Sequence, residues 1–258
     1  MQTLSSLWTW FATIILIVVW LPLLATIRLF DRDRARYTTG RWFRRLGATM
    51  TRVNPAWSIR VEGEIPADPR NPYVVIGNHQ SFADIPVISR LPWEMKWVAK
   101  AELFSVPLVG WMMKMAGDIP VKRGDRRSGA VVLSTARKYL RDRCSVMFFP
   151  EGTRSRDGRM LAFNDGAFRL AIKEQVPILP VAIDGTMNAL RKHDWRFGRA
   201  DQIHLKVLPP VPTAGLTSAD APELRDLVRA LIRDQIAEWR GVSPTEVDGR
   251  RDTIGASS

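Results

Sequence analysis

The apolar residues at the start of this 258-residue chain form one almost unbroken run, from Leu7 to Phe30. No Lys, Arg, Asp or Glu stands before Arg28. A run of this length suffices for a helix that crosses a hydrocarbon core about 30 Å thick, which needs ~20 residues. Because Pro22 and several tryptophans interrupt the run, a kinked helix in the membrane interface is the alternative to a full span.

The next stretch is basic and amphipathic. Between Arg41 and Met50, apolar side chains recur at helical spacing with arginines between them. Two interpretations fit this pattern: a basic helix on an anionic lipid surface, or an ordinary helix packed on a globular domain. Following an apolar segment, the pattern favours a membrane-attaching helical pair over residues 1–57.

Over residues 58–242, short apolar runs alternate with longer amphipathic stretches, which is typical of an α/β domain. The predicted fold is a mostly parallel or mixed central sheet of about seven strands flanked by helices. Strands are expected at residues 59–61, 73–77, 96–99, 119–122, 145–149, 178–183 and 203–208. Helices are expected to begin near Asp84, Glu102, Ser128 and Asp165, and a last helix is expected over residues 221–239. The polar residues 243–258 are predicted to form a disordered tail.

The composition adds a strong positive charge. Lys and Arg outnumber Asp and Glu by 38 to 26, and the net charge of +12 favours nucleic acid, phosphate-bearing substrates or an acidic membrane surface. Because the basic stretch follows an apolar segment of membrane length, we expect a bilayer and no nucleic acid as partner. The single cysteine, Cys144, is predicted to be a buried strand residue, which fits a cytoplasmic catalytic face.

The first candidate site follows the strand that ends at Gly77 and contains His79 and Asp84. Five positions on a regular helix turn through about 500°, so these two side chains cannot meet on one helix face. They can meet if His79 lies in the loop and Asp84 opens the helix. The carboxylate would then fix the tautomer of the imidazole and leave its other nitrogen free to accept a proton. Asp84 as a simple helix cap is the alternative.

The second candidate site follows the strand expected at residues 145–149 and reads Phe-Pro-Glu-Gly-Thr-Arg-Ser over residues 149–155. Gly152 would let the backbone approach a ligand, and the planar guanidinium of Arg154 suits a phosphate monoester. Strand ends are where α/β folds place their sites. Residues 151–154 are therefore predicted to belong to a site, whereas residues 155–159 are predicted to form a solvated turn.

These two motifs resemble the His-x4-Asp and Phe-Pro-Glu-Gly-Thr-Arg-Ser boxes of the glycerolipid acyltransferases related to 1-acylglycerol-3-phosphate acyltransferase. Two further stretches are similar to that family: residues 117–123, which end in the arginine Arg123, and the apolar run 176–181. The sequence departs from the family pattern at residues 119–121, where Ile-Pro-Val stands in place of an aromatic and acidic sequence.

The resemblance implies transfer of a fatty acyl group from acyl-coenzyme A or acyl carrier protein to the free sn-2 hydroxyl of lysophosphatidic acid. His79 and Asp84 would be the catalytic residues. His79 would act as base towards the acceptor hydroxyl, an aid worth about 10²–10⁴ in rate. The residues implied to bind substrate are Lys100, Arg123, Glu151, Gly152, Thr153 and Arg154. The resemblance implies no bound cofactor and no metal. The expected location is the cell inner membrane, with the catalytic domain on its cytoplasmic face.

Other functions stay open at this point. A histidine base would serve any hydroxyl, so the acceptor could be another lysolipid or glycolipid, such as a lyso-ornithine lipid. Outside enzymes, a basic protein that binds anionic lipid would share the charge and the apolar segment. The apolar stretch 103–113 is too short to span a bilayer, so we expect it to form a core helix or to line a tunnel for an acyl chain.

Overall fold

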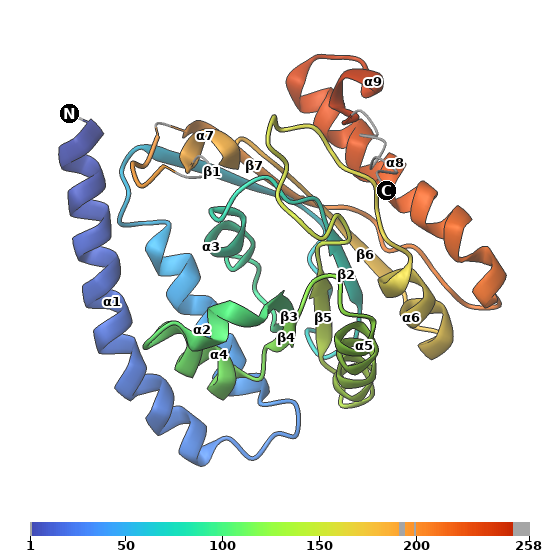
Figure 1. Cartoon of the computed structure of the whole chain (residues 1–258), viewed down its shortest axis with the longest axis horizontal. Helices are drawn as coiled ribbons and strands as arrows, with labels where there is room; N and C mark the ends of the chain where they lie inside the picture. The colour runs from blue at the N-terminus through green and yellow to red at the C-terminus, as the bar shows by residue number, and fades with distance from the viewer. Residues whose placement is uncertain (1, 191–193, 199, 250–258) are drawn as a thin grey trace, which may run out of the picture.

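A seven-stranded sheet with helices on both faces forms the centre of the protein (Figure 1). The computed structural model describes residues 2–190, 194–198 and 200–249. In sheet order, the strands are β1 (Trp57–Gly63), β7 (Ala200–Val207), β6 (Ile178–Asp184), β2 (Val74–Gly77), β5 (Ser145–Phe148), β3 (Met95–Lys100) and β4 (Ile119–Val121). All neighbouring strands are parallel except β6 and β7. The predicted mixed α/β sheet is confirmed, and each expected strand has a counterpart.

The strand order brings distant loops together. β2 and β5 are adjacent and parallel, with Ile76 opposite Phe148, and β3 and β4 continue the same parallel half of the sheet. Every residue of β2 and β5 is buried, as expected of apolar strands that are covered on both faces. Because parallel strands end at the same edge, the loops that follow β2, β5, β3 and β4 gather there.

Three helices cover one face of the sheet: α5 (Arg126–Arg141), α6 (Gly166–Glu174) and α8 (Ala221–Arg240). The side chain of Asp125 starts α5 by accepting hydrogen bonds from the backbone N–H groups of the helix's second and third residues. On α8, Leu224, Val228 and Ile232 recur every four residues and are buried. Burying each such side chain stabilises the fold by about 1.5–3 kcal/mol.

The other face is covered by α2 (Tyr37–Met50), α3 (Asp84–Ile88), the 3-10 helix η1 (Ala101–Ser105) and α4 (Val109–Ala116). The helix start expected near Glu102 corresponds to η1, but the core helix expected over residues 103–113 is divided, because η1 and α4 are separate elements. Pro107 lies between them and has no N–H to donate to a continuing helix. Leu103 faces a cavity, whereas Met112 and Met113 are buried, so this stretch contributes to both the core and a cavity wall.

Helix α1 (Gln2–Phe30) lies along the side of the domain (Figure 1). Near its start, the backbone N–H of Phe197 donates a hydrogen bond to Ser6 Oγ at 3.0 Å. Near its end, Leu24 packs with Leu46 of α2 and Met112 of α4. Among the described residues, α1 is the one helix long and apolar enough to cross a membrane. Its contacts at both ends hold it along the domain.

Helix α2 packs on the globular domain, in agreement with the second of its two interpretations. Arg44 is buried, and Arg41 Nη1 donates to the carbonyl of Leu91 at 2.9 Å. At least two of its arginines therefore face protein.

The C-terminal part differs from expectation. Ser243 and Glu246 form a capping box at the start of the short helix α9 (Pro244–Val247), and Val247 is fully buried. The predicted disordered tail is therefore wrong for residues 243–249, because a buried valine anchors this polar stretch. Residues 250–258 lie outside the described part of the chain. The remaining short elements are α7 (Thr186–Ala189) and the 3-10 helix η2 (Ser218–Asp220).

Candidate active site

One cavity of about 500 Å³ opens at the edge where the parallel strands end. It collects six of the eight predicted site residues, which come from the ends of β2, β5, β3 and β4. These six are His79, Lys100, Arg123, Gly152, Thr153 and Arg154. The other walls are largely apolar and include Trp97, Val132, Leu133, Phe148 and Phe149. Asp84 and Glu151 are not among the lining residues.

His79 and Asp84 are in contact, in the loop-then-helix arrangement that their spacing requires. His79 lies in the loop after β2, Asp84 is the first residue of α3, and their Nδ1 and Oδ2 atoms are 2.6 Å apart. The imidazole stacks on the ring of Phe149, with 4.1 Å between centroids. Because Nδ1 faces the carboxylate, Nε2 is the nitrogen left for a proton from a group in the cavity.

Asp84 does more than begin a helix. The N-cap position of α3 belongs to Ala83, and Asp84 itself is fully buried. Its Oδ2 atom accepts hydrogen bonds from the backbone N–H groups of Gln80 at 2.8 Å and Ser81 at 3.0 Å, both of which precede the helix. The carboxylate therefore folds the loop back onto itself and holds His79 against the cavity.

The second oxygen of Asp84 has a partner that sequence reasoning missed. Thr186 Oγ1 donates a hydrogen bond to Asp84 Oδ1, and Thr186 is fully buried. Thr186 begins α7, 102 positions further along the chain. It lies just after β6, a neighbour of β2 in the sheet. No local pattern marks this threonine, because its role depends on that strand pairing.

Removing the Thr186 hydroxyl should damage catalysis. Thr186→Val keeps the shape of the side chain but leaves one oxygen of a buried carboxylate without its donor, a loss of about 1–3 kcal/mol. We expect a turnover number lower by about tenfold or more, with the Michaelis constant for the acceptor little changed. Thr186→Ser keeps the hydroxyl and is the matched control. Initial rates over a range of acceptor concentrations test this, and equal rates for the two variants would contradict it.

Glu151 supports the same loop from behind. Its Oε1 atom accepts the backbone N–H of His79 at 2.7 Å, and its Oε2 atom accepts that of Leu161 at 3.0 Å. Both oxygens are thus engaged by the protein's own backbone, and the side chain is buried outside the cavity wall. In this arrangement Glu151 holds the backbone of the His79 loop and does not line the cavity, and its expected contact with substrate stays a prediction.

The protonation of Glu151 should be visible in the pH dependence of stability. Burial raises the pKa of Glu151 from 4.5 to about 8, against the lowering effect of its two backbone hydrogen bonds. Between these two values the folded protein holds a proton that the unfolded chain has lost. The free energy of unfolding should therefore fall as pH rises through this window.

Glu151→Gln has no proton to exchange and should remove this contribution. We expect the melting temperature of the wild type to exceed that of the variant most near pH 5, and the difference to shrink towards pH 8. Thermal melts of both proteins in the same detergent, at several pH values, measure it. A difference that stays constant across this range would show that Glu151 does not titrate there.

The cationic residues lie on the cavity wall. The Arg154 guanidinium lies over the ring of Phe82, with 3.9 Å from its central carbon to the ring centroid. Burial and the nearby charge of Arg123 lower the pKa of Arg154, while Asp84 raises it. Lys100 Nζ lies 3.3 Å from a carboxylate oxygen of Glu102. Two arginines and a lysine thus share a cavity with His79.

The loop after β5 is more buried than the solvated turn predicted for residues 155–159, since Ser155 and Gly158 are buried. Gly152 has a φ of +70°, in the left-handed region that favours glycine. The backbone N–H of Ser155 donates to the carbonyl of His79 at 2.9 Å, which ties the two motif loops together.

Cys144 is fully buried, and burial raises the pKa of its thiol to about 12. Such a thiol carries almost no thiolate at neutral pH, so it is not an activated nucleophile. In the described ranges, no group of three His, Cys, Asp or Glu side chains is arranged to hold a metal ion.

The site thus combines a histidine paired with a carboxylate and clustered cations at a sheet edge, a set of groups that suits acyl transfer to a phosphate-bearing hydroxyl compound. The sequence profile of the Acyltransferase family matches residues 58–184.

The relatives identify the family more narrowly. The 1-acyl-sn-glycerol-3-phosphate acyltransferase alpha of Homo sapiens is 40% identical over 207 residues, 78% of this chain and 70% of the human protein. A chloroplastic 1-acyl-sn-glycerol-3-phosphate acyltransferase of Brassica napus is 36% identical over 68% of this chain, which spans only 50% of the plant protein.

A solved structure agrees over nearly the whole length. The crystal structure of the 1-acyl-sn-glycerophosphate (LPA) acyltransferase PlsC from Thermotoga maritima has a TM-score of 0.77 and 29% identity to this chain. The similarity covers 94% of this chain and 97% of the other. The chain belongs to the 1-acyl-sn-glycerol-3-phosphate acyltransferase family, as its two motifs predicted.

Proposed function

We propose that this protein transfers a fatty acyl group from an acyl thioester to the sn-2 hydroxyl of lysophosphatidic acid and so forms phosphatidic acid. The observation that carries the proposal is the 2.6 Å contact between His79 and Asp84 beside a cavity that also holds Arg123 and Arg154. The names of the similar human, plant and bacterial proteins support it.

In this reaction His79 acts as general base. Its Nε2 atom takes the proton of the acceptor hydroxyl as the oxygen attacks the carbonyl carbon of the thioester. The new C–O bond forms, the C–S bond breaks, and the imidazolium returns its proton to the departing thiolate. Asp84 stabilises the imidazolium between these two events. Neither step needs a covalent acyl-enzyme, and acyl-coenzyme A or acyl carrier protein can supply the thioester.

The charged wall of the cavity suits the phosphate of the acceptor. Arg154 offers a planar fork that can bind two phosphate oxygens, and Arg123 and Lys100 add positive charge on the same wall. The apolar walls suit the acyl chains. Gly152 and Thr153, which precede Arg154 in the loop after β5, also line the cavity and would lie beside the phosphate.

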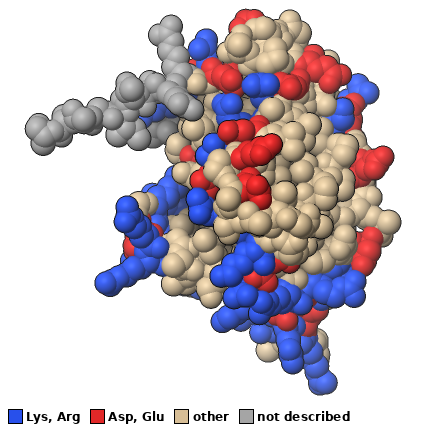
Figure 2. Space-filling model, turned by 90° about the vertical axis from the view of Figure 1, so that its right-hand side faces the viewer, with Lys and Arg blue, Asp and Glu red and all other residues tan. Residues whose placement is uncertain are grey.

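We further propose that residues 1–57 attach the enzyme to the cytoplasmic face of the cell inner membrane. The outward side of α1 is apolar, with Leu7, Phe11, Ile14 and Val18 at helical spacing and each more than half exposed. Since α1 contacts the domain near both ends, a position in the interface fits better than a span. Figure 2 views the molecule from the side away from α1 and shows further basic side chains on the lower part of that face.

An acceptor panel tests the function. Full-length enzyme in lipid vesicles receives lysophosphatidic acid, lysophosphatidylcholine or a lyso-ornithine lipid, each with acyl-coenzyme A and with acyl carrier protein as donor. Product analysis by mass spectrometry should find phosphatidic acid as the main product with at least one donor. Acylation of the phosphate-free lipid alone would favour the alternative acceptor. Lipid binding without any transfer would favour a non-enzymatic role.

A further inference from the structure

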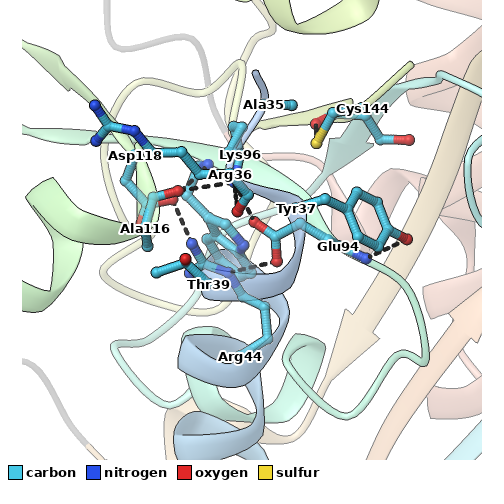
Figure 3. Close-up of polar contacts among 12 residues, drawn as sticks. Ala35, Arg36, Tyr37, Thr39, Arg44, Glu94, Lys96, Ala116, Asp118 and Cys144 are labelled. Carbon is cyan, nitrogen blue, oxygen red and sulfur yellow. Dashed lines mark hydrogen bonds and ion pairs between the residues drawn. The ribbon is translucent and has the colours of Figure 1, made fainter. Parts of the chain in front are cut away.

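Four buried charged residues join α2 to the sheet, away from the His79 motif (Figure 3). Arg44 comes from α2, Glu94 immediately precedes β3, Lys96 lies in β3, and Asp118 immediately precedes β4. Lys96 Nζ lies 2.9 Å from Glu94 Oε1. Arg44 pairs with Asp118, and its Nε atom lies 3.6 Å from Glu94 Oε2. We call these four residues the ion cluster.

The ion cluster requires a close approach of α2. A Cβ atom on Gly40 would lie 2.0 Å from Glu94 Oε1, so any larger residue at this position would force Glu94 and Lys96 to shift. Lys96 Nζ also donates to the carbonyls of Ala116 at 2.7 Å and Arg36 at 3.2 Å, which holds α2 and the end of α4 together. Burying charges is costly, and apolar residues of similar volume often stabilise such a contact equally well. The ion cluster therefore suggests a role in orientation.

Both ions of the Arg44–Asp118 pair act on Trp97, a residue of the cavity wall. Asp118 Oδ1 accepts the backbone N–H of Trp97 at 3.1 Å. The guanidinium carbon of Arg44 lies 5.3 Å from the centroid of the Trp97 ring, within the range of a cation–π contact. The pair thus holds Trp97 by its backbone and by its ring.

Trp97 continues this contact to the catalytic histidine. Its ring lies 5.9 Å from the ring of Phe149, and Phe149 stacks on His79 with 4.1 Å between centroids. These side chains are buried or nearly so, and a packed interior transmits displacements because it contains few voids. A path of direct contacts therefore runs from Arg44 on α2 to His79.

We propose that Arg44 is a positioning residue for acyl transfer, which acts through Trp97 and Phe149 on His79. Helix α2 then serves as a structural part of the catalytic wall as well as a part of the proposed membrane attachment. The inference rests on the proposed acyl transfer and names a residue that determines how well the base is placed. An error of about 1 Å in such placement can cost ~10²-fold in rate.

Two substitutions separate positioning from folding. Arg44→Lys keeps the positive charge of the ion cluster but loses the planar group that stacks on Trp97. Trp97→Leu keeps all four ions and removes the ring. Arg41→Lys is the matched control, because Arg41 lies on the same helix and bonds a carbonyl outside the ion cluster.

The experiment measures kcat/KM of the full-length enzyme in vesicles with lysophosphatidic acid, together with a thermal melt of each variant. We expect Arg44→Lys to lower kcat/KM about tenfold and Arg41→Lys to change it less than about twofold. Trp97→Leu should also lower kcat/KM. The double variant should have a kcat/KM no lower than that of the less active single variant, because both substitutions interrupt one path.

Other results would overturn the inference. Arg44→Lys could lower the melting temperature while the folded enzyme keeps the kcat/KM of the Arg41→Lys control, and the role of Arg44 would then be purely structural. Effects of Arg44→Lys and Trp97→Leu that multiply would also refute a shared path. If the wild type transferred no acyl group to lysophosphatidic acid, the proposed function itself would fail, and this outcome is visible before any variant is compared.

Discussion

Asp84→Asn should lower the turnover number of acyl transfer by about 10³ to 10⁴, with folding and membrane binding retained. The asparagine oxygen can still accept the N–H groups of Gln80 and Ser81, so the loop can keep its shape. The negative charge that stabilises the imidazolium of His79 is lost. The amide nitrogen also gives the wrong hydrogen-bonding partner either to His79 Nδ1 or to Thr186 Oγ1.

His79→Ala should be at least as severe, because it removes the base itself. His204→Ala is its matched control, since His204 lies on β7 and lines no part of the cavity. Single-turnover rates in vesicles, with circular dichroism and vesicle sedimentation to establish folding and binding, measure the effect. If Asp84→Asn kept more than about a tenth of wild-type turnover in a folded, membrane-bound enzyme, the pair could not be the catalytic base system.

Arg154→Ala should lower kcat/KM for lysophosphatidic acid by about 10- to 100-fold, the loss expected when a charge-assisted contact worth about 1.5–3 kcal/mol disappears. The Michaelis constant for the thioester donor should change little. Arg154→Lys should restore only part of the activity, because an ammonium group cannot bind two phosphate oxygens in the planar geometry of guanidinium.

The control for Arg154 is Arg156→Ala, because Arg156 is an exposed arginine two positions away that does not line the cavity. Comparing acceptors with and without a phosphate shows whether the lost contact is to phosphate. An equal loss for both kinds of acceptor would mean that Arg154 supports the loop and not the headgroup.

Part of the predicted N-terminal segment, residues 1–57, is packed into the domain. The apolar run and the basic helix predicted a membrane-attaching helical pair over residues 1–57, whereas Arg44 and Gly40 of α2 contact the rest of the domain through the ion cluster. Helix α2 thus takes part both in the proposed membrane attachment and in the proposed positioning of His79.

The local sequence determined the strands and both motifs. Short apolar runs mark buried parallel strands wherever covering helices exclude water, and the runs before Asn78 and Pro150 became β2 and β5. The spacing of His79 and Asp84 excluded a shared helix face and left the loop-then-helix arrangement as the one in which the two side chains can meet. The core helix expected over residues 103–113 is divided at Pro107, which has no N–H for a continuing helix. The disordered tail is wrong up to residue 249, because one buried residue, Val247, anchors an otherwise polar stretch.

Only the tertiary structure decided which distant residues support the site. Thr186, Glu151 and Arg44 reach the His79 loop directly or through neighbours, and each depends on a pairing of elements far apart in the chain. The strand order β1-β7-β6-β2-β5-β3-β4 differs from the order along the sequence. Hydrophobic periodicities of 2 or 3.6 residues predict strands and helices but do not determine this order. Local patterns state which side of an element is buried, whereas the partner on that side is selected by the packing of the whole chain.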